Sequence, residues 1–151
     1  MERVVEELWH KDQVVRVVLD LFAHTDARDW AKAKACFTSH VHFDMSSLSG
    51  GKPAQLSPAQ ITEGWDEGLR RLEAIHHQIG NLRVDLIDGG RAVVRCHGTA
   101  THFLPDPAGD TRTFIGTYEL GLREDADGWR IDRFVYRSRL VKGNLDLGES
   151  T

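Results

Sequence analysis

The chain of 151 residues carries 19 lysines and arginines against 23 aspartates and glutamates, which gives a net charge of −4, and 40% of its residues are hydrophobic. This length predicts one domain over residues 1–151. We expect its core at about 8–140, followed by a tail at 141–151. The basic residues are scattered, with Arg70-Arg71 as the only adjacent pair, so no nucleic-acid partner is expected.

Neither the N-terminus nor the cysteines indicate an export or membrane pathway. The opening segment, MERVVEELWHKDQ, is charged and lacks the apolar stretch of a signal peptide. No apolar run approaches the roughly 18 residues of a membrane span. Cys36 and Cys96 are too few and too far apart for a disulfide framework. We therefore expect a cytoplasmic protein with two reduced thiols.

The N-terminal third has the patterns of helices. Residues 10–25 predict a first helix, because apolar residues recur at the spacing of one buried face: Val14, Val17, Val18, Leu21 and Phe22. Asp29 is placed to cap a short second helix that runs through Ala33 to Phe37. Residues 41–45 alternate like a strand, and residues 46–56 predict a loop.

A third helix is predicted after the loop. Ser57, Pro58 and Gln60 have the spacing of an N-cap, a first-turn proline and the far half of a capping box. Its buried stripe consists of Ile61, Trp65, Leu69 and Leu72.

From residue 75 onward the hydrophobic period changes to two. Four strands are predicted, at about 75–88, 91–104, 111–124 and 128–140, with turn-forming residues between them. Helices followed by consecutive antiparallel strands predict an α+β fold. We expect a cone-shaped α+β barrel, in which a curved, mostly antiparallel sheet carries three N-terminal helices on its concave face. Such a cone leaves a pocket between the sheet and the helices.

Polar residues fall on two of these apolar faces. Asp26 lies four residues past Phe22, where the helical pattern requires an apolar side chain. His102 shares the apolar face of strand 91–104, so it is predicted to point inward and His97 outward.

A third inward residue depends on a bulge. The buried face of strand 75–88 changes from odd to even positions at Gly80-Asn81, and a β-bulge at Gly80 reconciles the two halves. His77 then points inward and His76 outward. A bulge one residue away would exchange the two histidines.

These three residues favour acid–base chemistry. A buried carboxylate is costly unless it is paired, and a histidine is its natural partner. An inward histidine oriented by an aspartate makes a general base. The structural alternative is that Asp26 caps the next helix and that the histidines are ordinary core residues. The convergence of Asp26, His77 and His102 favours catalysis.

Tyr118 lies on the inward face of strand 111–124 with Phe114 and Gly116. It is placed either to donate a hydrogen bond in the pocket or to rest half-buried at its rim. His40 and His42 have no third ligand at a suitable spacing, so no metal site is expected. No glycine-rich dinucleotide loop is present, and no cofactor is expected.

Four segments resemble the SnoaL-like branch of the nuclear transport factor 2-like superfamily. They are Asp26 in HTDARDW, His77 in IHHQIGNLRV, His102 in TATHFL, and the run FIGTYELGLREDADGWRI, and the resemblance extends over roughly residues 8–140. It implies the cone fold and, by similarity to scytalone dehydratase and the lindane dehydrochlorinase, proton transfer by Asp26, His77 and His102. It also supports the inward orientation of His77.

The resemblance also suggests the pocket wall. Thr25 and Met45 stand where scytalone dehydratase has tyrosines that hold the departing water, and Phe134 lies near an arginine position of the dehydrochlorinase. The expected substrate pocket comprises Phe22, Thr25, Met45, Trp65, Phe114, Gly116 and Phe134. Tyr118 could supply the missing phenol.

The sequence thus predicts a cofactor-independent, dehydratase-like lyase for a small organic substrate. His77 removes a proton, Asp26 orients His77 or His102, His102 protonates a leaving hydroxyl or polarises a carbonyl, and Tyr118 donates a hydrogen bond. The alternatives are an isomerase, a polyketide-type cyclase, or a non-catalytic module that binds a hydrophobic ligand or oligomerises. A homodimer or homotrimer is expected, in which the outward sheet face around Arg95, His97, Thr99 and Thr101 could form the interface.

Overall fold

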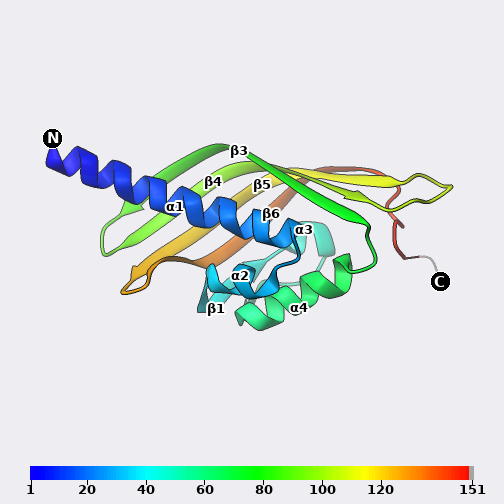
Figure 1. Cartoon of the computed structure of the whole chain (residues 1–151), viewed down its shortest axis with the longest axis horizontal. Helices are drawn as coiled ribbons and strands as arrows, with labels where there is room; N and C mark the ends of the chain where they lie inside the picture. The colour runs from blue at the N-terminus through cyan, green and yellow to red at the C-terminus, as the bar shows by residue number, and fades with distance from the viewer. Residues whose placement is uncertain (150–151) are drawn as a thin grey trace.

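The computed structural model describes residues 1–149 (Figure 1). Its elements are α1 (Glu2–Asp26), α2 (Trp30–Ala35), β1 (Phe37–Asp44), α3 (Ser46–Ser49), β2 (Ala54–Leu56), α4 (Pro58–Leu69), β3 (Ala74–Ile87), β4 (Arg91–Phe103), β5 (Thr111–Asp125) and β6 (Gly128–Gly143). Among these helices, none combines the length and the apolar character that a membrane crossing requires. Of the predicted tail, residues 150–151 lie outside the described residues.

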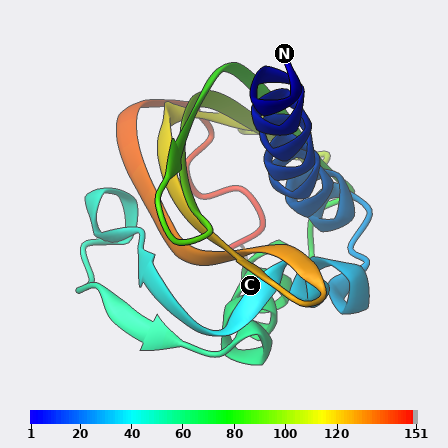
Figure 2. The same ribbon diagram turned by 90° about the vertical axis from the view of Figure 1, so that its left-hand side faces the viewer.

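The six strands form one curved sheet in the order β2-β1-β6-β5-β4-β3. All neighbours are antiparallel except β1 and β6, which run parallel. In the end-on view of Figure 2 the sheet bends into an incomplete cone, and α1 lies beside its concave side. The predicted α+β fold is confirmed, and β2 and β3 remain as open edges of the sheet.

Several predicted boundaries were wrong. The first helix begins at Glu2, the second helix ends at Ala35, and the first strand begins at Phe37 instead of residue 41. The predicted loop at 46–56 contains α3 and β2. The Asp44 carboxylate stabilises the start of α3, because it accepts hydrogen bonds from the backbone N–H and the hydroxyl of Ser46 at 2.9 and 2.6 Å. β2 exists because it pairs with β1, with Val41 opposite Leu56.

The predicted bulge is present. The pairing of β3 with β4 shifts between Gly80 and Arg83, and Asn81 has a φ of 51°, in the left-handed region. This extra residue lets both halves of β3 turn their apolar side chains toward the helices. As a result, His77 is mostly buried and His76 is exposed.

The core lies between α1 and the concave face of the sheet. Val14, Val18 and Leu21 of α1 are fully buried against inward residues of the strands, such as Val94 and Leu120. The predicted caps hold the other helices: Asp29 accepts from the Lys32 amide, and Ser57 forms the capping box with Gln60. This packing fixes the C-terminal end of α1 beside β3.

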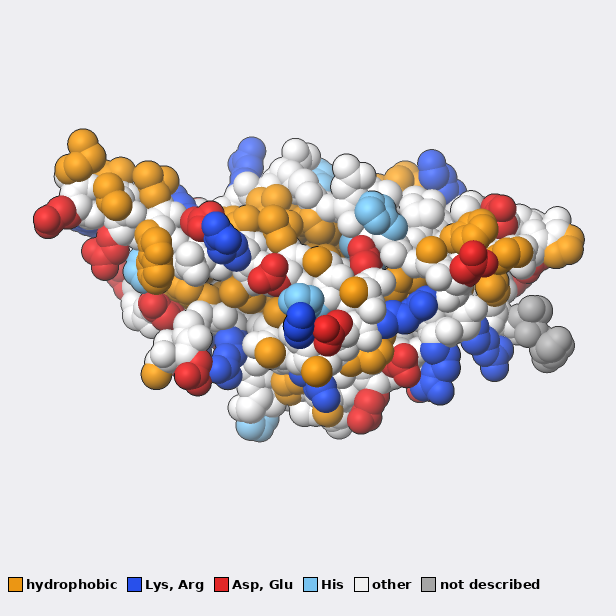
Figure 3. Space-filling model, in the orientation of Figure 1, with side chains coloured by type: hydrophobic (Ala, Val, Ile, Leu, Met, Phe, Trp, Pro, Cys, Tyr) orange, Lys and Arg blue, Asp and Glu red, His pale blue; other side chains and the backbone are white. Residues whose placement is uncertain are grey.

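The first turns of α1 extend beyond the sheet. Val4, Val5, Leu8 and Trp9 are each more than half exposed there. Hydrophobic side chains accordingly gather at the N-terminal end of the molecule in Figure 3. Because this part of the helix has no core to face, the buried stripe of residues 10–25 does not continue into it. The stripe therefore could not reveal that the helix begins before residue 10.

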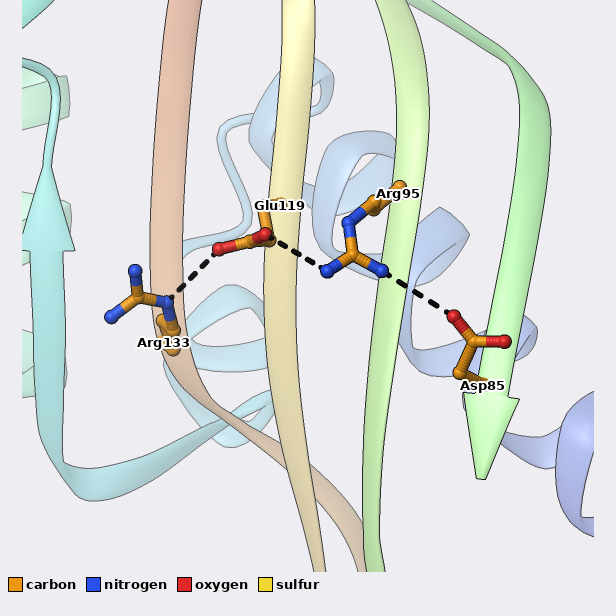
Figure 4. Close-up of polar contacts among 4 residues, drawn as sticks. All are labelled: Asp85, Arg95, Glu119 and Arg133. Atoms are coloured by element: carbon orange, nitrogen blue, oxygen red, sulfur yellow. Dashed lines mark hydrogen bonds and ion pairs between the residues drawn. The ribbon is translucent and has the colours of Figure 1, made fainter. Parts of the chain in front are cut away.

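The outward face of the sheet carries a row of ion pairs across four strands (Figure 4). Glu119 of β5 lies between Arg95 of β4 and Arg133 of β6, and Arg95 also contacts Asp85 of β3, each at 3.3 Å. Cross-strand pairs of opposite charge stabilise a sheet modestly. They also explain how a solvent-facing sheet surface tolerates so many charges.

Two glycines, opposite each other on β4 and β5, shape the inward face. Gly98 pairs with Gly116. A Cβ on Gly98 would overlap the ring of Tyr118, and a Cβ on Gly116 would overlap the Tyr136 side chain and the Arg137 carbonyl. The bare backbone therefore lets the two tyrosine rings lie close to the sheet, with their centroids 4.9 Å apart.

Substitution Gly98→Ala should lower the free energy of unfolding by about 1–3 kcal/mol, since the added methyl must displace a buried ring. Gly80→Ala is the matched control in the sheet, because a Cβ there meets nothing within 4 Å. It should be neutral or slightly stabilising. Urea unfolding of both variants measures the difference. Equal stability of the two would contradict the proposed packing of Tyr118 on Gly98.

Candidate active site

A cavity of about 240 Å³ lies between the sheet, the end of α1 and α4. Its wall includes His77, His102 and Tyr118, together with most of the predicted pocket: Phe22, Thr25, Met45, Trp65, Phe114 and Phe134. Asp26 lies behind His77 rather than on the wall. Gly116 is also absent from the wall, since the Tyr136 ring occupies the space above it.

A larger hollow of about 490 Å³ lies at the sheet around Arg83, Arg95 and Arg137. Its lining includes Arg95 and Glu119 of the outward ion-pair row. The smaller cavity is the better candidate, because it combines apolar walls with a few converging polar groups, including a buried carboxylate–histidine pair.

Asp26 and His77 form that pair. The Asp26 Oδ1 is 2.6 Å from His77 Nδ1, and Oδ2 accepts the backbone N–H of His77 at 2.8 Å. The side chains of His77 and Asp26 are only 13% and 20% exposed. Because Nδ1 donates to the carboxylate, Nε2 is left as the basic nitrogen of His77. The question of which histidine pairs with Asp26 is thus answered by geometry.

His102 is paired with a cation instead of a carboxylate. The Nε of Arg112 donates to His102 Nδ1 at 3.0 Å. A guanidinium is only a donor, so His102 Nδ1 must be the unprotonated acceptor and Nε2 carries the hydrogen. Burial lowers the pKa of His102 to about 4, and the charges of Arg112 and His77 act in the same direction. His102 is therefore a neutral hydrogen-bond donor near pH 7.

The strand registers give the order of these groups across the sheet. His77 of β3 is opposite Ala100 of β4, and His102 is opposite Arg112 of β5. The two histidines are thus diagonal neighbours, with Cα atoms roughly 7–8 Å apart. Phe114 of β5 is opposite Ala100, on the level of His77, and its ring centroid is 5.1 Å from that of His102.

Two phenols complete the polar groups. Burial raises the pKa of Tyr118, so its hydroxyl remains protonated and can only donate or accept hydrogen bonds. Tyr136 also lines the cavity, and its buried hydroxyl has no hydrogen-bond partner within residues 1–149. Because this oxygen is shielded from solvent and lies over Gly116, Tyr136 contributes its ring to the cavity wall.

Arg112 and Tyr136 are site residues that the sequence interpretation missed. A usable signal existed for both. Arg112 has the parity of Phe114 on its strand, and Tyr136 has the parity of Phe134.

The remaining reactive groups do not form a second site. Burial raises the pKa of both thiols, Cys36 and Cys96, to about 11, so neither is a thiolate near neutral pH. Over residues 1–149, no group of three or more His, Cys, Asp and Glu side chains could hold a metal ion.

Solved structures with the same fold are similar over nearly the whole chain. Kfla4162 from Kribbella flavida has a TM-score of 0.88 at 20% identity, over 95% of this chain and 99% of that chain. The hexachlorocyclohexane dehydrochlorinase LinA-type3 from Novosphingobium barchaimii has a TM-score of 0.78 at 10% identity, over 95% of each chain. A protein proposed to be a scytalone dehydratase, from Novosphingobium aromaticivorans, has a TM-score of 0.75 at 16% identity, over 90% of this chain and 88% of that chain.

At these identities the likeness shows a shared fold. No curated protein sequence matches the chain. The SnoaL-like domain matches residues 6–135, which span the three inward polar residues and all but the last part of the sheet. The resemblance inferred from the segments around Asp26, His77 and His102 is therefore confirmed, and the chain belongs to the SnoaL-like domain family.

Proposed function

We propose that this protein is a cofactor-independent lyase of the dehydratase type, acting on a small organic molecule with an acidic C–H next to a carbonyl. The observation that carries the proposal is the Asp26–His77 pair, in which His77 lines an apolar cavity and its Nδ1 contacts the carboxylate, so that Nε2 is left for a substrate. A buried histidine oriented by a carboxylate is the usual arrangement of a general base.

In the first step, His77 Nε2 takes the proton from the carbon beside the carbonyl. Asp26 holds the ring in the required tautomer and stabilises the imidazolium that forms. The electron pair left on carbon delocalises onto the carbonyl oxygen and gives an enolate. The apolar wall of Phe22, Phe114 and Phe134 excludes water, which strengthens each electrostatic contact with this charge.

The second histidine has a narrower role than the sequence suggested. His102 was expected to protonate a leaving hydroxyl or to polarise a carbonyl. Its low pKa and its Arg112 contact leave it neutral, so it is suited to the second role, with Nε2–H donating to the enolate oxygen. Tyr118 can donate to the same oxygen or to the leaving group.

The elimination then balances within the cavity. The enolate re-forms its carbonyl as the β-carbon releases hydroxide, and the His77 imidazolium returns the abstracted proton to that hydroxide. One C–H and one C–O bond break, one C=C bond forms, and water leaves. The names of two similar proteins, a dehydrochlorinase and a proposed dehydratase, both denote eliminations, which supports this choice.

Isomerase and cyclase activities share the first step and differ only in the fate of the enolate. A non-catalytic ligand-binding module is the alternative of another class. In its favour, Asp26 also accepts a backbone N–H, so it joins the end of α1 to β3 and could be kept for stability alone. Substitutions at Asp26 and His77 separate a catalytic role of this pair from a purely structural one.

Asp26→Asn and His77→Gln should each reduce turnover by about 10²- to 10⁴-fold. His77→Gln removes the base, and Asp26→Asn removes the carboxylate that fixes its tautomer and stabilises the imidazolium. The assay is proton NMR in D₂O with a panel of β-hydroxy ketones, following loss of water and deuterium incorporation beside the carbonyl. His76→Gln is the matched control, because His76 is the adjacent but exposed residue. It should retain wild-type turnover.

Loss of folding instead of turnover in Asp26→Asn would favour the structural role of this carboxylate. Full turnover in a folded His77→Gln variant would refute the proposed base.

The free energy of unfolding should fall as the pH drops through the window from about 6.5 to 4. The pKa of His102 is lowered to about 4 in the folded protein, so the unfolded chain binds the extra proton across this window. The loss should approach about 2–3 kcal/mol near pH 4.5. His102→Asn retains an acceptor for Arg112 but cannot titrate. Urea unfolding at pH 7 and 4.5 should show a smaller loss in that variant, and an equal loss would contradict a buried neutral His102.

A further inference from the structure

Arg112 is a partly buried cation at one end of the cavity. It lies on the inward face of β5, two residues before Phe114, and its guanidinium is 5.6 Å from the centroid of the Phe114 ring. Burial lowers its pKa, although a guanidinium still remains charged. A charge in this position requires strong partners.

The hydrogen-bond partners that the structure provides are neutral, while the Glu149 carboxylate acts on Arg112 from beyond ion-pair distance. Nε donates to His102, and Nη1 donates to the carbonyl oxygens of Leu145 and Leu147 at 3.4 and 3.1 Å. Within residues 1–149 no carboxylate pairs with Arg112, and Nη2 has no hydrogen-bond partner. The guanidinium is thus held in a fixed position with one edge free, which is the preorganised state of an anion-binding arginine.

The free cation lies where the cavity meets a second hollow. A hollow of about 530 Å³ at the surface is lined by α4 and the C-terminal segment, and it shares exactly two lining residues with the cavity: Gly68 and Arg112. Its other charged residues include Arg70, which pairs with Asp66, and Arg71, which donates to the Gly148 carbonyl. Glu67 and Glu149 also line it. Of the three arginines that line this hollow, Arg112 is the one that also lines the cavity.

Two glycines of α4 leave this end open. Gly64 and Gly68 are one helical turn apart, both line the cavity, and a Cβ on either would meet nothing within 4 Å. Glycine is costly inside a helix relative to alanine. Since no packing demands it here, the space above the two glycines is better explained by the passage of a ligand.

We propose that Arg112 binds a carboxylate of the substrate, which would therefore be a small organic acid with an apolar body. The inference rests on the proposed function of the same cavity. The registers place Arg112 two strands and two residues away from His77, a Cα separation of roughly 12 Å. A substrate of one or two rings spans this gap, with its carboxylate on the guanidinium and its acidic C–H near His77 Nε2.

The test uses phenylacetate and phenylacetamide, which have nearly the same shape and differ in charge. NMR titration of the wild-type protein, following the His102 and Phe114 ring signals, gives both dissociation constants. Phenylacetate should bind at least about tenfold more tightly, as expected for one charge-assisted contact. Equal binding of the two probes to the wild type would overturn the inference without any variant.

Arg112→Gln should abolish the preference for phenylacetate and leave phenylacetamide binding nearly unchanged. Arg112→Lys should retain part of the preference, because it keeps the charge but loses the planar fork. Arg71→Gln removes the same charge from the rim of the outer hollow and is the matched control. If Arg112→Gln kept the preference for phenylacetate, or if Arg71→Gln lost it, the preference would come from the overall positive charge of the hollow and not from a contact with Arg112.

Gly68→Leu should weaken both probes by similar factors, because the longer side chain narrows the opening without changing its charge. Leucine is a good helix former, so the thermal midpoint should not fall. Unchanged binding of both probes to this variant would exclude the opening beside Gly68 as the binding place.

The proposed function can fail separately. A preference for phenylacetate that persists in Asp26→Asn, combined with no turnover of any β-hydroxy ketone or keto acid, would refute the lyase and leave the carboxylate site. Turnover of neutral β-hydroxy ketones without any preference for acids would support the lyase and refute the carboxylate site at Arg112.

Discussion

The contact between Asp26 and His77 is the constraint on which the rest of the site depends. Both carboxylate oxygens are used by one residue, through its ring and its backbone N–H, so the last turn of α1 is fixed against β3. The bulge after Gly80 lets this orientation of His77 coexist with a buried face along the second half of the strand. The contact therefore determines the position of the α1 end, the orientation of His77 on the bulged strand β3 and the tautomer of its ring. His77 in turn forms part of the cavity wall.

The same sheet makes two histidines chemically different by giving them opposite partners. A carboxylate at Nδ1 leaves His77 with a basic Nε2, whereas a guanidinium at Nδ1 leaves His102 with an Nε2–H. Separation of roles between two similar groups is a common design of acid–base sites. Here the separation of roles depends on the neighbour that each ring contacts. His77 lies beside the end of α1, which carries Asp26, and His102 lies directly across from Arg112 of β5.

The sequence was sufficient for features that repeat along the chain. Long alternating strands predicted the sheet, helical spacing placed Asp26 inward, and strand parity placed His102 inward. Parity left His77 and His76 exchangeable, and the family resemblance supported His77. The sequence was insufficient for β2, whose three residues are a strand only because β1 lies beside them. It was also insufficient for Arg112, which parity placed inward but whose charge suggested solvent. The acceptors that hold it, the carbonyls of Leu145 and Leu147, come from a segment more than 30 residues away, and no local pattern reports such a contact.

The glycine pair under the two tyrosines has a consequence for how this scaffold can change. Where Tyr118 and Tyr136 form the cavity wall, they rest on bare backbone at Gly98 and Gly116. Exchanging a ring for a smaller side chain would deepen the cavity and leave the strands in place. Adding a side chain to either glycine would collide with the ring above it. The cavity can therefore be enlarged for bulkier substrates by replacing the tyrosines, whereas the two glycines cannot be replaced without a collision. Variation in this part of the fold is thus expected at the tyrosines.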